Sequence, residues 1–142
     1  MRASSVAHLL RHAKQSAEGV FARELPALTP RQFAILVCLN GHSALSQSDI
    51  AARTGIDRST VADLVCRIAK KGLLRRRRSR EDARAYDVEL TNAGRAALRS
   101  LEPKARRVEA TILSALSQNE RKAFLEALAV IVDRAVESRD DR

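Results

Sequence analysis

The sequence predicts a mainly α-helical protein that carries one small β-hairpin, or wing. Over most of the chain apolar residues recur every three or four positions, which is the period of an amphipathic helix. Capping signals, such as Thr29 with Gln32 and Ser117 with Glu120, mark where helices begin. Between residues 86 and 90 the period falls to about two, which is typical of a half-buried strand.

Two helices are expected first, at residues 5–24 and 31–40. Pro26 interrupts the pattern between them, and Thr29 and Pro30 supply the N-cap and first position of the second helix. The second helix is apolar nearly all round, so we expect it to be buried on several sides.

Two shorter helices follow, at residues 47–54 and 58–71, joined by a turn at Gly55. Ser46 and Asp57 supply their N-caps. The second of these helices has a polar face opposite one apolar stripe, which consists of Val61, Leu64, Val65 and Ile68. This is the pattern of a helix-turn-helix, whose second helix is free to enter the major groove of DNA.

The wing is expected after Gly72, with strands near residues 73–78 and 86–90 and a tip at residues 79–83. Thr91 and Asn92 then cap a long helix to about residue 116, and Pro103 should kink this helix. A last helix, capped by Ser117, should end near residue 137.

The first helix and the last two helices have apolar faces that one short chain cannot bury. Because the same helices of a second copy would cover these faces, we expect a two-fold homodimer. The predicted organisation is an N-terminal dimerisation helix (1–28), a winged helix-turn-helix DNA-binding domain (29–91) and C-terminal dimerisation helices (92–142).

The positive charge of the chain is concentrated in one region. Residues 53–86 contain eleven Lys or Arg and four Asp or Glu, so they carry seven of the nine net positive charges. A basic patch of this kind on a nearly neutral body indicates a polyanionic partner, here double-stranded DNA.

Other classes of protein are disfavoured. The sequence has no apolar run of about 18 residues and no signal peptide, so we expect a cytoplasmic protein. Its two cysteines lack the spacing of a zinc site or a disulfide framework, and there is no glycine-rich phosphate loop or catalytic pair of side chains. We therefore expect neither an enzyme nor a metal or cofactor site.

Candidate DNA contacts lie on the polar face of the second helix of the helix-turn-helix. Arginine can bind guanine through two hydrogen bonds, and hydroxyl groups suit base edges or phosphates. The candidates are Arg58, Ser59, Thr60, Asp63 and Arg67. Two roles stay open for Asp63, which could accept a hydrogen bond from cytosine or orient Arg67 one helical turn away.

The wing supplies a second group of candidates. Neighbouring residues on a strand face opposite sides, so four consecutive arginines cannot all act alike. Arg84 is best placed to enter a narrow minor groove, with Asp82 holding its guanidinium. The wing candidates are Arg76, Arg78, Arg80, Asp82 and Arg84.

Six motifs occur in an order that resembles the MarR family of bacterial winged-helix regulators. They lie at residues 28–33, 50–55, 59–61, 70–74, 82–84 and 90–94, and the resemblance covers nearly the whole chain. It implies a homodimer that binds a palindromic promoter site, usually as a repressor. It also implies release from DNA by a small, frequently aromatic, acid or a related ligand.

The resemblance implies a ligand pocket between the first, second and fifth helices. An anionic ligand could meet cationic residues of the first helix at the pocket mouth and apolar residues of the second helix within. The candidates are His8, Arg11, His12, Phe33, Leu36 and Val37. Such a pocket would suit an aromatic carboxylate or an acyl-CoA thioester, although the two histidines could equally be ordinary surface or interface residues.

Two other functions stay open. A redox sensor would use Cys38 or Cys66, of which Cys38 is expected to be inert packing and Cys66 the more exposed thiol. An architectural protein would use the same basic face without reading bases.

Overall fold

The structure, a computed structural model, describes residues 5–82 and 84–140, with side chains as far as residue 138. Ala83, which belongs to the expected wing tip, lies outside the described residues. The elements in chain order are α1 (Val6–Glu24), α2 (Pro30–Leu39), β1 (Leu45–Ser46), α3 (Gln47–Thr54), α4 (Arg58–Lys70), β2 (Leu74–Arg78), β3 (Tyr86–Leu90), α5 (Asn92–Ile112) and α6 (Gln118–Asp140).

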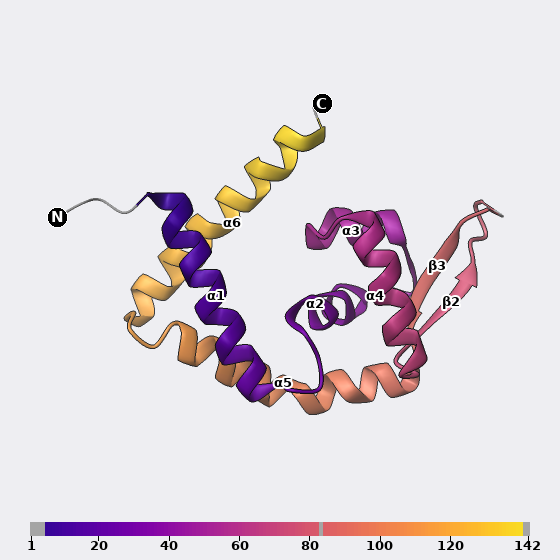
Figure 1. The fold of residues 1–142 in the computed structure, drawn as a ribbon, viewed down its shortest axis with the longest axis horizontal. Helices are drawn as coiled ribbons and strands as arrows, with labels where there is room; N and C mark the ends of the chain where they lie inside the picture. The colour runs from indigo at the N-terminus through magenta and orange to yellow at the C-terminus, as the bar shows by residue number, and fades with distance from the viewer. Residues whose placement is uncertain (1–4, 83, 141–142) are drawn as a thin grey trace.

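A compact lobe contains α2, α3, α4 and a small sheet (Figure 1). The sheet is antiparallel with the order β1-β3-β2. In its core, fully buried side chains of three helices meet the sheet at Val88, and these are Ile35, Leu36, Leu39, Ile50, Val61, Val65 and Ile68. The predicted helix-turn-helix and wing are therefore confirmed as one packed unit.

The N-cap predictions are confirmed in detail. Thr29 and Gln32 form a complete capping box, and Ser117 and Glu120 exchange the same two hydrogen bonds. Gly55, at φ 72°, ends α3 in the left-handed conformation that favours glycine. These local signals are why the helix starts could be located from sequence.

The structure differs from the expectations in two places. The strand β1 was not predicted; its Leu45 pairs with Val88 and adds a third strand to the wing sheet. The helix α5 ends at Ile112, earlier than expected, because a turn separates it from the cap at Ser117. The helix α2 is buried on several sides, as expected, with Val37 48% exposed.

The long helix α5 runs along the base of the molecule and joins the lobe to α1 and α6 (Figure 1). It remains one helix across Pro103. A second, smaller core of Phe21, Leu25 and Val108 packs α1 against α5. The ring of Phe21 meets Phe33 of α2 edge-on at 5.5 Å, so this core also contacts the lobe.

Apolar side chains remain exposed on α1 and α6. Figure 1 shows α6 extending from the end of α5 as an arm separate from the lobe. The exposed residues are Val6, Leu9 and Leu10 on α1, and Phe124, Leu125, Val130, Ile131, Val132 and Val136 on α6. An apolar surface of this extent is typical of an interface with another protein.

The start of α5 is fastened to the junction between α4 and β2. The Thr91 hydroxyl donates to the Gly72 carbonyl (2.6 Å) and accepts from the Gly94 N–H (3.0 Å). A Cβ at position 94 would lie 2.1 Å from the Leu73 carbonyl oxygen, so only glycine fits there. This contact explains the sequence motif at residues 90–94.

We expect Gly94→Ala to destabilise the protein by about 1–3 kcal/mol or more, because the added methyl group overlaps backbone that cannot move aside cheaply. Chemical denaturation at one fixed protein concentration measures the free energy of unfolding. The control is Gly19→Ala in α1, where the nearest atom is the flexible end of Arg23 at 3.9 Å. Gly19→Ala should be neutral or stabilising by up to about 1 kcal/mol. Equal effects of the two changes would contradict this account of position 94.

Candidate nucleic-acid interface and ligand cleft

The first turn of α4 is organised by Asp57. Its carboxylate accepts hydrogen bonds from the Ser59 hydroxyl (2.7 Å), the Thr60 hydroxyl (2.7 Å) and the Thr60 N–H (2.9 Å). These bonds hold the pKa of Asp57 well below its usual range, with the Ser59 hydroxyl as the largest cause. Because both hydroxyl protons are directed at Asp57, the oxygens of Ser59 and Thr60 are left as hydrogen-bond acceptors.

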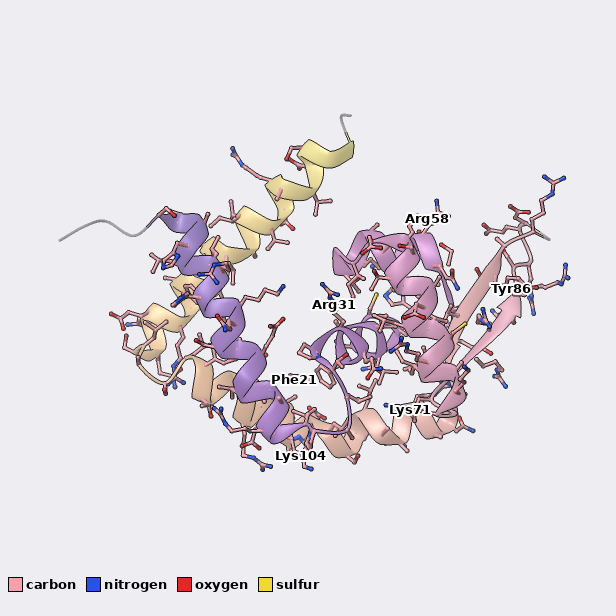
Figure 2. All side chains as sticks on the ribbon, in the orientation of Figure 1. Phe21, Arg31, Arg58, Lys71, Tyr86 and Lys104 are labelled. Atoms are coloured by element: carbon pink, nitrogen blue, oxygen red, sulfur yellow. The ribbon has the colours of Figure 1, made fainter. Side chains whose placement is uncertain are left out.

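The remaining candidates of α4 are exposed on the face opposite the core. Figure 2 shows Arg58 at the N-terminal end of α4 and Lys71 beyond its other end. Arg67 Nε lies 3.2 Å from Asp63 Oδ2, which is the contact that the second of the two predicted roles of Asp63 requires. At the far end of α4, Lys71 Nζ donates to the Ala27 carbonyl (3.2 Å) and braces the helix against the α1–α2 connection.

The β2–β3 register sorts the arginine run. Arg75 faces Glu89, whose Oε1 accepts from its Nε and Nη2, both at 2.7 Å. Arg77 Nη1 lies 3.5 Å from Glu89 Oε2. On the opposite face, Arg78 stacks over the ring of Tyr86 at 5.8 Å. Glu89 and Tyr86 were not among the predicted site residues, although each is recognisable as a cross-strand neighbour once the register is known.

The wing tip is shaped by side chains that bind backbone. The Ser79 hydroxyl oxygen accepts from the N–H groups of Glu81 (3.2 Å) and Asp82 (3.4 Å). The Asp82 carboxylate accepts from the Arg84 N–H (2.9 Å). Asp82 therefore holds the backbone of Arg84, and not its guanidinium as the sequence predicted. The side chains of Arg80 and Arg84 are exposed at this tip.

The cysteines give no support to a thiol switch. Burial raises the pKa of Cys38, although nearby Arg53 acts in the opposite direction, so the reactive thiolate is disfavoured. Cys66 is half-buried, as Cys38 is. Within the described part of the chain no cluster of His, Cys, Asp or Glu could hold a metal ion, and no helix is long and apolar enough to cross a membrane.

A cleft of about 480 Å³ lies where α1, α2 and α5 meet the turn between α3 and α4. Its walls are largely apolar, and Lys14 and Arg31 add positive charge. Figure 2 shows Arg31 projecting from α2 into the space between α1 and α3. Glu18 pairs with Lys14 at 3.8 Å. The other lining residues are Ala17, Phe21, Pro30, Ala34, Thr54, Gly55, Ile56, Val108 and Ile112.

None of the six predicted pocket residues lines this cleft. His8, Arg11 and His12 are exposed nearer the start of α1, with the two imidazole rings 4.7 Å apart. Leu36 is fully buried in the lobe. Phe33 and Val37 line a separate hollow of about 290 Å³ between α2 and α5. The cleft uses the opposite face of α2, which sequence periodicity alone could not distinguish.

The lowered pKa of Asp57 predicts an acid-sensitive start of α4. Because folding lowers this pKa, the stabilisation is complete above the usual value of 3.8 and is lost as the pH falls below it. We expect Asp57→Asn, which can still cap the helix, to show a weaker decline of unfolding free energy than the wild type between about pH 4 and 2. Denaturation at each pH, referred to pH 7 for each protein, measures the two slopes. Equal slopes would show that Asp57 carries no such linkage.

Comparison with known proteins gives one consistent result. The model of the MarR family matches residues 28–86. The transcriptional repressor NicR of Pseudomonas putida is 33% identical over 130 residues, which cover 90% of this chain and 82% of NicR.

Two solved structures are similar over nearly their whole length. One is BpsR of Bordetella bronchiseptica, whose DNA binding is regulated by 6-hydroxynicotinic acid (TM-score 0.87, 32% identity, 92% of this chain and 94% of BpsR). The other is the transcriptional repressor CouR bound to a 23-mer DNA duplex (TM-score 0.83, 30% identity, 90% of this chain and 92% of CouR). The chain belongs to the MarR family and is a winged-helix, DNA-binding transcriptional repressor rather than an enzyme.

Proposed function

We propose that the chain acts in the cytoplasm as a homodimer on a palindromic DNA operator. The exposed apolar faces of α1 and α6 support this proposal, because a second copy would cover them. A two-fold axis through these helices would present two copies of α4, as a palindromic site requires.

In the proposed complex α4 reads the major groove and the wing binds beside it. Exposed guanidinium groups from both elements would meet bases and phosphates, and these belong to Arg58, Arg67, Arg76, Arg78, Arg80 and Arg84. Ser59 and Thr60 would accept hydrogen bonds from amino groups of adenine or cytosine, because their protons are held by Asp57. Asp63 and Asp82 would position their neighbours.

We further propose that an aromatic acid bound in the cleft releases the repressor from DNA. One observation carries this proposal: the cleft is lined by Thr54, Gly55 and Ile56, which directly precede the cap of α4. A ligand there would contact both α1 and the turn that leads into the DNA-reading helix. Lys14 and Arg31 would attract its carboxylate, and the ring would lie on apolar wall. The regulation of BpsR by 6-hydroxynicotinic acid supports this class of ligand.

The ligand can release DNA only by binding the DNA-incompetent arrangement more tightly than the competent one. In the proposed mechanism it favours a spacing of the two α4 helices that does not match the operator. An acyl-CoA thioester remains the second ligand class, with its acyl group in the cleft.

A thermal-shift screen of aromatic carboxylates and their CoA thioesters tests the ligand class. Each compound that binds is then added to the complex of the protein with labelled operator DNA, and dissociation of the DNA is measured. Competition with an unrelated duplex at one stated salt concentration separates this function from an architectural one. A ratio of the two affinities near one would favour the architectural protein.

We expect Arg84→Ala to weaken operator binding by about 1–3 kcal/mol, because a groove contact is lost. Fluorescence anisotropy measures the affinity, and sedimentation checks that the dimer persists. The control is Arg23→Ala on α1, which removes the same charge from another exposed site. If Arg84→Ala binds like the control, the proposed role of the wing tip is wrong.

We expect Arg31→Gln to weaken binding of an aromatic carboxylate at least about tenfold, because a charged hydrogen-bond donor is lost, while operator binding persists. Calorimetry with the best compound of the screen measures the change. Arg11→Gln makes the same substitution outside the cleft and should leave ligand affinity unchanged. If Arg11→Gln weakens ligand binding and Arg31→Gln does not, the pocket lies at the start of α1, near His8 and His12.

A further inference from the structure

We propose that Glu89 positions two wing arginines away from DNA and so limits the sequence-independent attraction of the wing for phosphates. The inference rests on the proposed contact between the wing and DNA. Glu89 lies on the strand opposite the arginine run and outside the motifs that resemble the family.

One face of the wing is electrically balanced. Residues directly opposite each other on paired strands lie on the same face of a sheet. The register places Arg75 opposite Glu89 and Arg77 opposite Asp87. This face therefore joins two positive to two negative side chains.

The other face of the wing carries the core side chains Leu74, Val88 and Leu90 as well as Arg76. Arg76 lies opposite Val88, which offers no carboxylate, and its side chain is exposed. The wing therefore holds Arg75 and Arg77 in ion pairs with Glu89 on one face and leaves Arg76 exposed on the other.

Glu89 holds both of its partners from a mostly buried position. Both of its oxygens are used, one by Arg75 and the other by Arg77. The side chain of Glu89 is only 14% exposed, whereas those of Arg75 and Arg77 are 64% and 41% exposed. A phosphate that captured either arginine would leave a mostly buried carboxylate with one charged partner fewer, which is more costly than exchanging partners at an open surface.

Each contact between an arginine and a phosphate adds affinity for DNA of any sequence. If Arg75 and Arg77 were released from Glu89, the repressor would bind unrelated DNA more tightly and leave it less readily when its ligand binds. Restraint by Glu89 keeps this background low and leaves Arg76 exposed on the other face.

Glu89→Gln tests the proposal in the full-length dimer. We expect binding to an unrelated duplex to tighten about threefold to tenfold at 50 mM salt, and the slope of log affinity against log salt to steepen by about one to two. The matched control is Glu102→Gln, which makes the same charge change and breaks an ion pair with Arg106 on α5, away from the wing. A purely structural role of Glu89 would not steepen the salt dependence. Equal effects of both variants, or weaker binding by a folded Glu89→Gln dimer, would overturn the proposal.

A mutant cycle tests whether Glu89 affects DNA binding through Arg75 and Arg77. In a protein that carries Arg75→Gln and Arg77→Gln, the further change Glu89→Gln should not alter DNA affinity. Arg75→Gln alone should also cost less affinity than Arg76→Gln alone, and this comparison holds even if Glu89→Gln fails to fold. Equal losses in these two variants would refute the division between the two faces. Failure of Arg84→Ala to weaken binding would instead count against the wing contact itself.

Discussion

The architecture depends on one close approach, between the first turn of α5 and the backbone that follows α4. Gly94 lies against the Leu73 carbonyl, and Thr91 bonds to Gly72 and to Leu73. The end of α4, the start of β2 and the start of α5 therefore meet at a point without spare space. Since packed interiors resist compression, a movement of α5 must be passed to α4 and β2 or absorbed elsewhere.

In the proposed mechanism the position of the cleft matters because it adjoins another contact with the lobe. There Phe21 of α1 meets Phe33 of α2, and the cleft opens beside Phe21. At Gly94 the lobe is packed tightly against α5. At the cleft, Thr54, Gly55 and Ile56 line open space, so a bound molecule would add contacts there. In the proposed mechanism a small ligand would act on α4 from its N-terminal end and leave the contact of Lys71 at its other end in place.

Much of the fold could be predicted because its signals are local. Asp57 and the Thr29 and Ser117 capping boxes specify helix starts within a few residues, and alternating side chains identify β3. The strand β1 has two residues, too few to show any period. The cleft depends on which face of α2 meets α1, and the role of Glu89 depends on strand register. Both are relations between elements far apart in the chain, so neither Arg31 nor Glu89 was recognisable as a site residue from periodicity.

The exposed apolar residues of α6 have a consequence for the cell as well as for the fold. In the proposed dimer each protomer buries its apolar faces only against a second protomer. Folding is therefore coupled to dimerisation, and the stability of the protein depends on its concentration. Below some abundance, protomers would expose Phe124, Leu125 and Ile131 to water, where they invite aggregation or degradation. The level of synthesis would then set a threshold below which the operator is left open, whatever the supply of ligand.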